Sequence, residues 1–201
     1  MKADGRKLTQ VLTPLAAVRF LFSFEVLLVL FIFSGTYKTA PAFAWIPFDL
    51  TGFFFCLSVM TGAALLLLRP SRPDIAGKAV SISVFGALVA YNLLSLAWSP
   101  SDKYAVVKSF YLASLATWAF AAGLLLVSSD ERRVERLFKA LVCFSFVVGL
   151  ESLIAYLKDP LAQCVLAFGS AKVNYLSTSA AIAPGVIVLA SYHASRRMSP
   201  F

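Results

Sequence analysis

The chain has 201 residues, of which 60% are hydrophobic and 14% are charged, and its formal net charge is +8. A soluble domain is about 45–50% apolar and about 25% charged, so this chain has too few polar side chains to cover a water-facing surface. The composition predicts an integral membrane protein. The positive charge does not indicate nucleic-acid binding, because the cations stand in short clusters between apolar segments, as they do in membrane proteins.

Six segments are apolar and long enough for membrane-spanning helices, which need about 20 such residues. They are Leu15–Ser34, Leu50–Leu68, Ala79–Trp98, Tyr104–Val127, Leu137–Leu157 and Tyr175–His193. Strict alternation of apolar and polar residues, the pattern of a membrane β-barrel, is absent. We therefore expect an all-α, polytopic bundle of about six transmembrane helices that forms a single domain over residues 1–201.

The cations are distributed unevenly over the connections between these segments. Of the 18 Lys and Arg residues, five occupy alternate connections or their borders: Lys38, Lys103, Lys108, Lys158 and Lys172. The other thirteen lie near the two termini and in the connections around residues 69–78 and 132–139. Because cytoplasmic loops are rich in Lys and Arg, both termini are expected in the cytoplasm.

The stretch FSGTYKTAPAFAWIPFDLTGFFF, residues 33–55, contains the first outer connection. Trp45 suits the membrane–water interface, and Pro41 and Pro47 interrupt helical structure. Asp49 directly precedes the second segment, where a carboxylate accepts hydrogen bonds from the free N–H groups of a helix start. The stretch therefore predicts an ordered outer loop and a helix capped by Asp49, or else a binding site to which Asp49 and Lys38 contribute.

The connection SSDERRVERLFKAL, which begins at residue 128, predicts the start of the fifth helix on the cytoplasmic surface. Ser128 and Glu131 have the spacing of a capping box. Glu135 and Lys139 have the i, i+4 spacing of a favourable ion pair. A solvated helix end accounts for this pattern without a ligand.

Ionisable residues inside membrane segments are costly and by default indicate function. Glu25, Lys108 and Glu151 are the residues concerned. Lys108 and Glu151 fall at similar depths in consecutive antiparallel segments, which predicts an ion pair between them. The alternative is that Lys108 extends to the membrane surface and that Glu151 is protonated or hydrogen-bonded to a hydroxyl.

Lys108 and Glu151, together with other polar residues, also predict a polar crevice that faces outward. Tyr104, Lys108 and Tyr111 share one helical face. With Asp49, Asn92, Glu151 and Asn174 they would line a crevice suited to an anionic lipid head group or a sugar. The alternative is that these side chains only hold helices together. Three Cys and one His form no metal-binding pattern, so neither a metal nor a cofactor is expected, and no catalytic residue can be assigned.

Several motifs, in their order along the chain, resemble the N-terminal half of the O-antigen ligase and O-antigen polymerase superfamily of bacterial envelope glycosyltransferases. They are FSGTYK, IPFDLT, NLLSLAWSPSDKYAVVKSFYLASL, DERRVERLFKAL and NYL. The resemblance implies a multi-pass protein of the bacterial inner membrane that acts in lipopolysaccharide or other polysaccharide biosynthesis. Such enzymes transfer a glycan from undecaprenyl pyrophosphate to lipid A–core or to a growing polysaccharide.

The family comparison further implies that these residues form half of a larger bundle. The family's large periplasmic loop, with its arginines and histidine, follows the part that this chain resembles, so no catalytic residue can be transferred and activity in isolation is not expected. Partners would be the lipid bilayer, the lipid-linked glycan and a C-terminal half or other envelope-assembly proteins. Lys38 and Asp49 would lie where the donor enters. The alternative is a non-catalytic membrane scaffold or a permease subunit.

Overall fold

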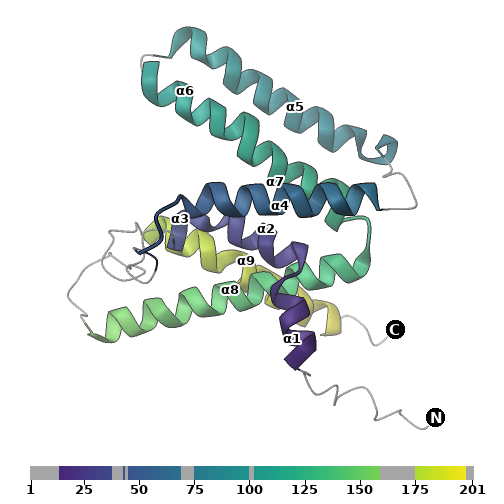
Figure 1. Ribbon diagram of the computed structural model, residues 1–201, viewed down its shortest axis with the longest axis vertical. Coiled ribbons are helices and arrows are strands. Elements are labelled where there is room, and N and C mark those ends of the chain that lie inside the picture. The colour runs from purple at the N-terminus through teal and green to yellow at the C-terminus, as the bar shows by residue number, and fades with distance from the viewer. Residues whose placement is uncertain are drawn as a thin grey trace.

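The computed structural model describes residues 14–37, 43, 45–68, 75–99, 102–158 and 175–197, and every regular element within these ranges is a helix (Figure 1). The all-α prediction is therefore confirmed for these residues. The α-helices are α1 (Pro14–Leu21), α2 (Phe24–Ile32), α3 (Ser34–Tyr37), α4 (Leu50–Leu67), α5 (Ala79–Leu94), α6 (Asp102–Tyr111), α7 (Thr117–Ala121), α8 (Glu131–Lys158) and α9 (Tyr175–Arg197). The 3-10 helices η3 (Ala76–Lys78) and η4 (Ser95–Trp98) flank α5, and the π-helical segments η5 (Leu112–Ala116) and η6 (Ala122–Val127) flank α7.

Within the described ranges, four helical stretches are long and apolar enough to cross a membrane, which indicates a membrane-embedded protein. They are Leu50–Leu67, Ala76–Trp98, Tyr104–Val127 and Glu131–Ile154. They match the second to fifth predicted segments, and the bounds of the second and fourth agree within one residue. A shorter apolar stretch, Ser179–His193, lies within α9.

The first predicted segment is not one continuous helix. It is divided into α1, α2 and α3. Ser23 has extended backbone angles and its hydroxyl accepts a hydrogen bond from Val26 N–H at 3.4 Å, so it caps a new helix instead of continuing α1. Phe33 then departs from helical geometry at the other end of α2. A serine within an otherwise apolar run is enough to supply the cap, which hydrophobic length alone does not reveal.

Helix α8 starts at a different cap from the one predicted. The Asp130 carboxylate accepts a hydrogen bond from Arg132 N–H at 2.9 Å, as an N-cap residue does. Ser128 instead donates its hydroxyl proton to the Leu124 carbonyl at 2.7 Å, at the end of η6. The predicted ion pair between Glu135 and Lys139 is confirmed, with 2.7 Å between the carboxylate and the ammonium.

A buried carboxylate joins α2 to α8. Only 1% of the Glu25 side chain is exposed, and its Oε1 lies 3.4 Å from both Arg133 Nη1 and Arg136 Nη2. Asp130 lies 3.8 Å from Arg133 and extends this network toward the surface. A carboxylate without such partners would be strongly destabilised at this depth, so the arginines fix where the first turn of α2 meets α8.

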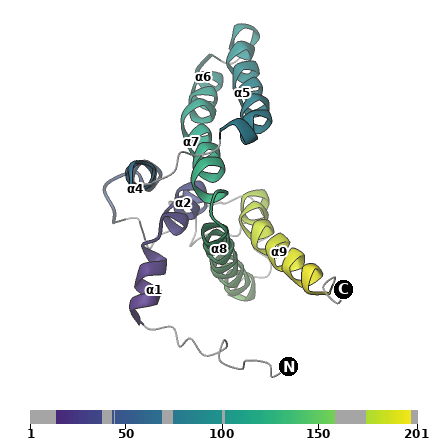
Figure 2. The ribbon, with the colours of Figure 1, turned by 90° about the vertical axis from the view of Figure 1, so that its right-hand side faces the viewer.

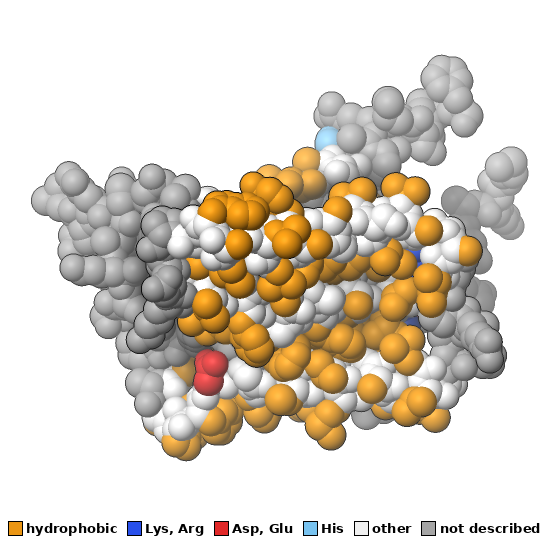
Figure 3. Space-filling view, turned by 90° about the horizontal axis from the view of Figure 1, so that it is seen from above, with side chains coloured by type: hydrophobic (Ala, Val, Ile, Leu, Met, Phe, Trp, Pro, Cys, Tyr) orange, Lys and Arg blue, Asp and Glu red, His pale blue; other side chains and the backbone are white. Residues whose placement is uncertain are grey.

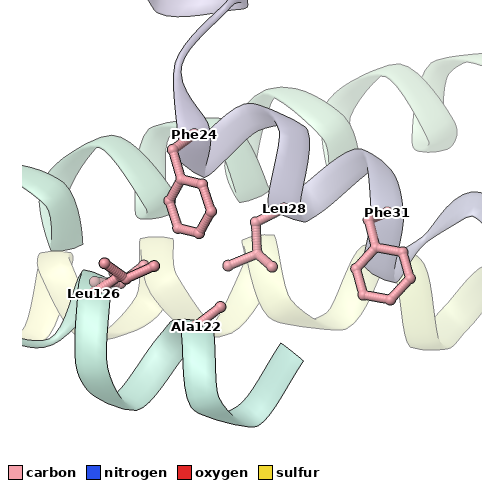
Figure 4. Packing of buried hydrophobic residues seen from close by; sticks show 6 residues of the cluster. Phe24, Leu28, Phe31, Ala122 and Leu126 are labelled. Carbon is pink, nitrogen blue, oxygen red and sulfur yellow. The ribbon is translucent and has the colours of Figure 1, made fainter. Parts of the chain in front are cut away.

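The hydrophobic core lies between α2 and the end of the fourth segment (Figure 4). Phe24, Leu28 and Phe31 recur at helical spacing along one face of α2 and meet Ala122 and Leu126 of η6 (Figure 4). Each of these five side chains is at least 96% buried. Helix α2 also packs against α4, while α8 and α9 lie side by side in both ribbon views (Figures 1 and 2).

Two close contacts between helices depend on glycine. A Cβ atom on Gly62 would lie 2.7 Å from the Trp118 ring, whose Nε1–H donates to Ser58 Oγ at 2.9 Å. A Cβ atom on Gly185 would lie 2.5 Å from Ser145, whose hydroxyl donates to the Ala181 carbonyl at 2.9 Å. Small residues and hydroxyl donors of this kind are typical of helix pairing in membranes, where backbones must approach closely.

Helices α5 and α6 form a hairpin that extends away from the rest of the bundle (Figures 1 and 2). Phe85 of α5 stacks on Phe120 of α7 with 4.2 Å between ring centroids, and Ser109 donates to Asn92 Oδ1 at 2.8 Å. No residue of α5 is buried. The face seen in Figure 3 is largely hydrophobic, and charged side chains show only toward its margins, as expected of a surface that faces lipid.

Replacing Glu25 with alanine is expected to lower the free energy of unfolding by about 2–3 kcal/mol. Loss of one partner of a fully buried ion pair costs about 3–5 kcal/mol, and the cost is smaller here because Arg133 and Arg136 are 21% and 43% exposed. Thermal or denaturant unfolding of the purified protein in one detergent measures the change.

Glu135→Ala is the matched control, because it removes a carboxylate whose side chain is 65% exposed and paired with Lys139 on the same helix. An exposed pair contributes about 0–1 kcal/mol. Equal losses from Glu25→Ala and Glu135→Ala would show that the buried network does not hold α2 to α8.

Candidate functional site

Several polar side chains meet in a crevice between the α2–α3 corner, the start of α4 and the α6–α7 segment. Its volume is about 460 Å³, within the range of small-ligand sites. Its side chains with polar groups are Ser34, Thr51, Lys108 and Tyr111. The remaining wall is apolar and consists of Phe31, Ile32, Leu112, Leu115, Ala116 and Ala119.

Asp49 positions one wall of this crevice by capping α4. Its Oδ1 accepts a hydrogen bond from Thr51 N–H at 3.2 Å, and its carbonyl accepts from Phe53 N–H at 3.0 Å. The predicted N-cap role of Asp49 is therefore confirmed. The cap fixes Thr51, whose hydroxyl oxygen accepts a hydrogen bond from Ser34 at 2.9 Å. The start of α4 and the α3 turn are thus held together at the crevice.

Lys108 is the cation of the crevice. Its side chain is exposed, and its ammonium lies 5.2 Å from the ring centroid of Tyr104, within the range of a cation–π contact. Tyr111, one turn further along, lines the same crevice and is 51% exposed. The predicted shared face of Tyr104, Lys108 and Tyr111 therefore gives a cation near the Tyr104 ring, on a wall that Tyr111 also lines.

The predicted ion pair between Lys108 and Glu151 is not formed, although both side chains are described. Helix α8 packs against α2 and α9, while α6 belongs to the hairpin with α5. In the view of Figure 1, α6 lies above α2 and α4, and α8 lies below them. Similar predicted depth did not bring the two residues together, because the fourth segment meets α8 at η6, whereas α6, which carries Lys108, packs with α5.

Four other residues predicted for the crevice or its entrance have different positions or lie outside the described residues. Glu151 is partly buried on α8 and does not line the crevice. Asn92 accepts the hydrogen bond of Ser109, so it joins α5 to α6. Lys38 and Asn174 lie outside the described residues. The structure therefore brings Lys108 and Tyr111 together, with Asp49 supporting the wall beside them.

Sequence reasoning missed the Ser34–Thr51 pair and the π-helical wall. The segment η5 supplies Leu112, Leu115 and Ala116 to the crevice. The Thr117 hydroxyl donates to the Leu112 carbonyl, five residues earlier, at 3.1 Å. Such π-helical turns widen a helix and often border functional sites. The polar spacing of Ser34 and Thr51 across the first outer connection was the available signal for their pairing.

Tyr37 is the last residue of α3 and is buried. Its hydroxyl donates to the Leu30 carbonyl at 2.7 Å. Tyr37 therefore acts as a support, and its ring packs edge-on to Phe54 and Phe144.

The crevice can bind anionic oxygen atoms but holds no evident catalytic pair. One ammonium, one phenol and the Thr51 hydroxyl are donors for a phosphate or a sugar, while Ser34 already donates its proton to Thr51. Among the described residues no group of three or more His, Cys, Asp or Glu is placed to hold a metal ion. Comparison of the chain with family models, with characterised proteins and with solved structures found no match.

Proposed function

We propose that the chain is a bacterial inner-membrane domain with six membrane-crossing segments and both termini in the cytoplasm. The broken α1–α3 stretch and α9 would add two segments to the four long apolar stretches. The connections predicted to face the cytoplasm contain basic side chains that make structural contacts, which supports this orientation. Lys78 donates to Leu124 O and to Ser128 Oγ at the end of η6, and Arg133 and Arg136 contact Glu25 near the start of α8.

Within this topology, we propose that the crevice receives the pyrophosphate of an undecaprenyl-linked glycan. The observation that carries this proposal is Lys108, a cation with Tyr104 and Tyr111 beside it at the rim of an apolar-walled crevice. Attraction between the ammonium and a phosphate is stronger beside a low-dielectric wall than in bulk water. The apolar wall suits the first isoprene units, and the Thr51 hydroxyl, which accepts from Ser34, can donate to a phosphate or sugar oxygen.

The protein would then be the N-terminal part of a membrane glycan ligase or polymerase of the O-antigen type. The motifs that resemble that superfamily support this step. In this account the crevice binds and orients the donor, and the acid–base groups for transfer to lipid A–core or a growing polysaccharide come from elsewhere. They would belong to a C-terminal half or to another envelope-assembly protein.

A permease subunit is the second candidate, and one observation favours it. The first segment is interrupted at Phe22 and Ser23, where α1 ends and α2 begins. Interrupted helices line the substrate sites of many transporters. A permease would bind a soluble solute, whereas the first proposal requires a lipid-linked pyrophosphate, so the ligand distinguishes the two.

Reporter fusions test the topology. Fusions after Leu68 and Val127 are expected to report a cytoplasmic position, and those after Lys38 and Lys158 a periplasmic one, because Lys and Arg concentrate in the connections that follow Leu68 and Val127. Alkaline phosphatase and green fluorescent protein fusions give opposite signals on the two sides. A periplasmic signal after Val127 would contradict the six-segment arrangement.

Lys108→Gln is expected to weaken binding of undecaprenyl pyrophosphate about tenfold while leaving binding of undecaprenol unchanged, because a charge-assisted hydrogen bond contributes ~1.5–3 kcal/mol. Binding is measured with the purified protein in nanodiscs by competition against a labelled pyrophosphate lipid.

Lys139→Gln is the matched control for this binding experiment, since it removes the same charge from α8 outside the crevice. Equal affinities for Lys108→Gln, Lys139→Gln and the unmodified protein would exclude the crevice as the pyrophosphate site.

A further inference from the structure

A second hollow lies on the opposite side of α2 from the crevice. It is an apolar groove of about 560 Å³ between α2, α8, the end of α1 and the start of α4. Its wall includes Leu21, Val29, Phe48, Ala140, Cys143 and Val147. The Tyr37 hydroxyl, a polar group at its wall, is already bonded to the Leu30 carbonyl. The groove therefore offers apolar contact and no free hydroxyl there.

The sequence positions of the wall residues show that the groove follows the length of α2 and α8. Val29 lies one turn beyond Glu25, and Ala140 lies one turn beyond Arg136. Glu25 and Arg136 are in contact, so one end of the groove is the ion network and the other lies near Phe48, just before α4. An apolar channel thus leads away from a cluster of arginines.

Arg136 has a donor to spare at that end. Its Nη2 lies 3.4 Å from Glu25, while its Nε is buried and has no hydrogen-bond partner within the described part of the chain. The buried Nε is not open to a ligand, but the side chain as a whole is 43% exposed, so another N–H group of the guanidinium is the donor that a ligand can reach. Arg133 shares the same Glu25 oxygen, and Arg19 directly precedes the groove residue Phe20. Glu25 and Asp130 together balance the charges of Arg133 and Arg136, so the excess of positive charge at this end comes from Arg19.

We propose that this groove is a binding site for an anionic glycerophospholipid of the leaflet on the basic side of the protein. One acyl chain lies along the groove between α2 and α8, and the phosphate accepts hydrogen bonds from Arg136. Basic pockets between membrane helices recognise anionic head groups in this way. The proposal requires only that the protein is embedded in a membrane, so it stands or falls separately from the pyrophosphate crevice near Lys108.

The test compares two lipids that differ only in head group. The purified protein in neutral detergent is supplied with equal amounts of dioleoyl phosphatidylglycerol and dioleoyl phosphatidylcholine, and native mass spectrometry counts each lipid bound. Phosphatidylglycerol should be retained about fivefold more, the ratio expected of one effective arginine near a membrane surface. Equal retention of the two lipids by the unmodified protein would overturn the proposal.

Four variants locate the site. Arg136→Gln should remove the preference, while Lys139→Gln should keep it, because Lys139 is paired with Glu135 outside the groove. Glu25→Gln should increase the preference, since Arg136 then loses the carboxylate that competes with the lipid phosphate and only Asp130, at Arg133, remains. A purely structural role of Glu25 would not produce this increase. Cys143→Trp, which fills the exposed groove wall, should lower retention of both lipids.

The set of variants keeps the test decisive even if one of them does not fold. If Arg136→Gln does not fold, Glu25→Gln and Cys143→Trp still decide the question. An unchanged preference in Glu25→Gln would overturn the role of the arginines, and unchanged retention in Cys143→Trp would overturn the groove as the place of the acyl chain.

Discussion

The contact of Glu25 with Arg133 and Arg136 is the constraint on which the rest of the arrangement depends. A carboxylate that is 99% buried would be strongly destabilised without partners, so the start of α2 must lie against the start of α8. Ser23 caps α2 at this point and separates it from α1. Once α2 is placed, Phe24, Leu28 and Phe31 face the end of the fourth segment, and the core forms around them (Figure 4).

The central position of α2 gives it two functional faces. Phe31 and Ile32 face the crevice with Lys108, while Val26 and Val29 face the apolar groove beside α8. The two hollows therefore share a wall but differ in chemistry: one has a cation and hydroxyls at its rim, and the other is apolar along its length. In the proposed account, the first receives a lipid-linked pyrophosphate and the second a structural phospholipid.

Local patterns in the sequence predicted the features that depend on residues close together in the chain, namely helix bounds, a helix cap and an ion pair within one helix. Apolar length gave the bounds of α4, the residue before that helix gave the Asp49 cap, and i, i+4 spacing gave the Glu135–Lys139 pair. Contacts between distant segments were not predictable in this way. Glu25 lies more than 100 positions from its partners, and the Lys108–Glu151 pair failed because depth does not say which helices are neighbours. The helix break at Ser23 was not predicted, because the mean hydropathy of the first segment is that of a single membrane-spanning helix.

Cross-linking in membranes tests directly which face of α2 lies against α8. Phe33 stacks on Phe144 of α8 with 4.9 Å between ring centroids, whereas Ile32 lines the crevice on the other side. In a chain carrying Cys56→Ser, Cys143→Ser and Cys164→Ser, the pair Phe33→Cys and Phe144→Cys should be bridged rapidly by dibromobimane. The pair Ile32→Cys and Phe144→Cys should remain unbridged. Bridging of the second pair and not the first would contradict the placement of α2 between crevice and groove.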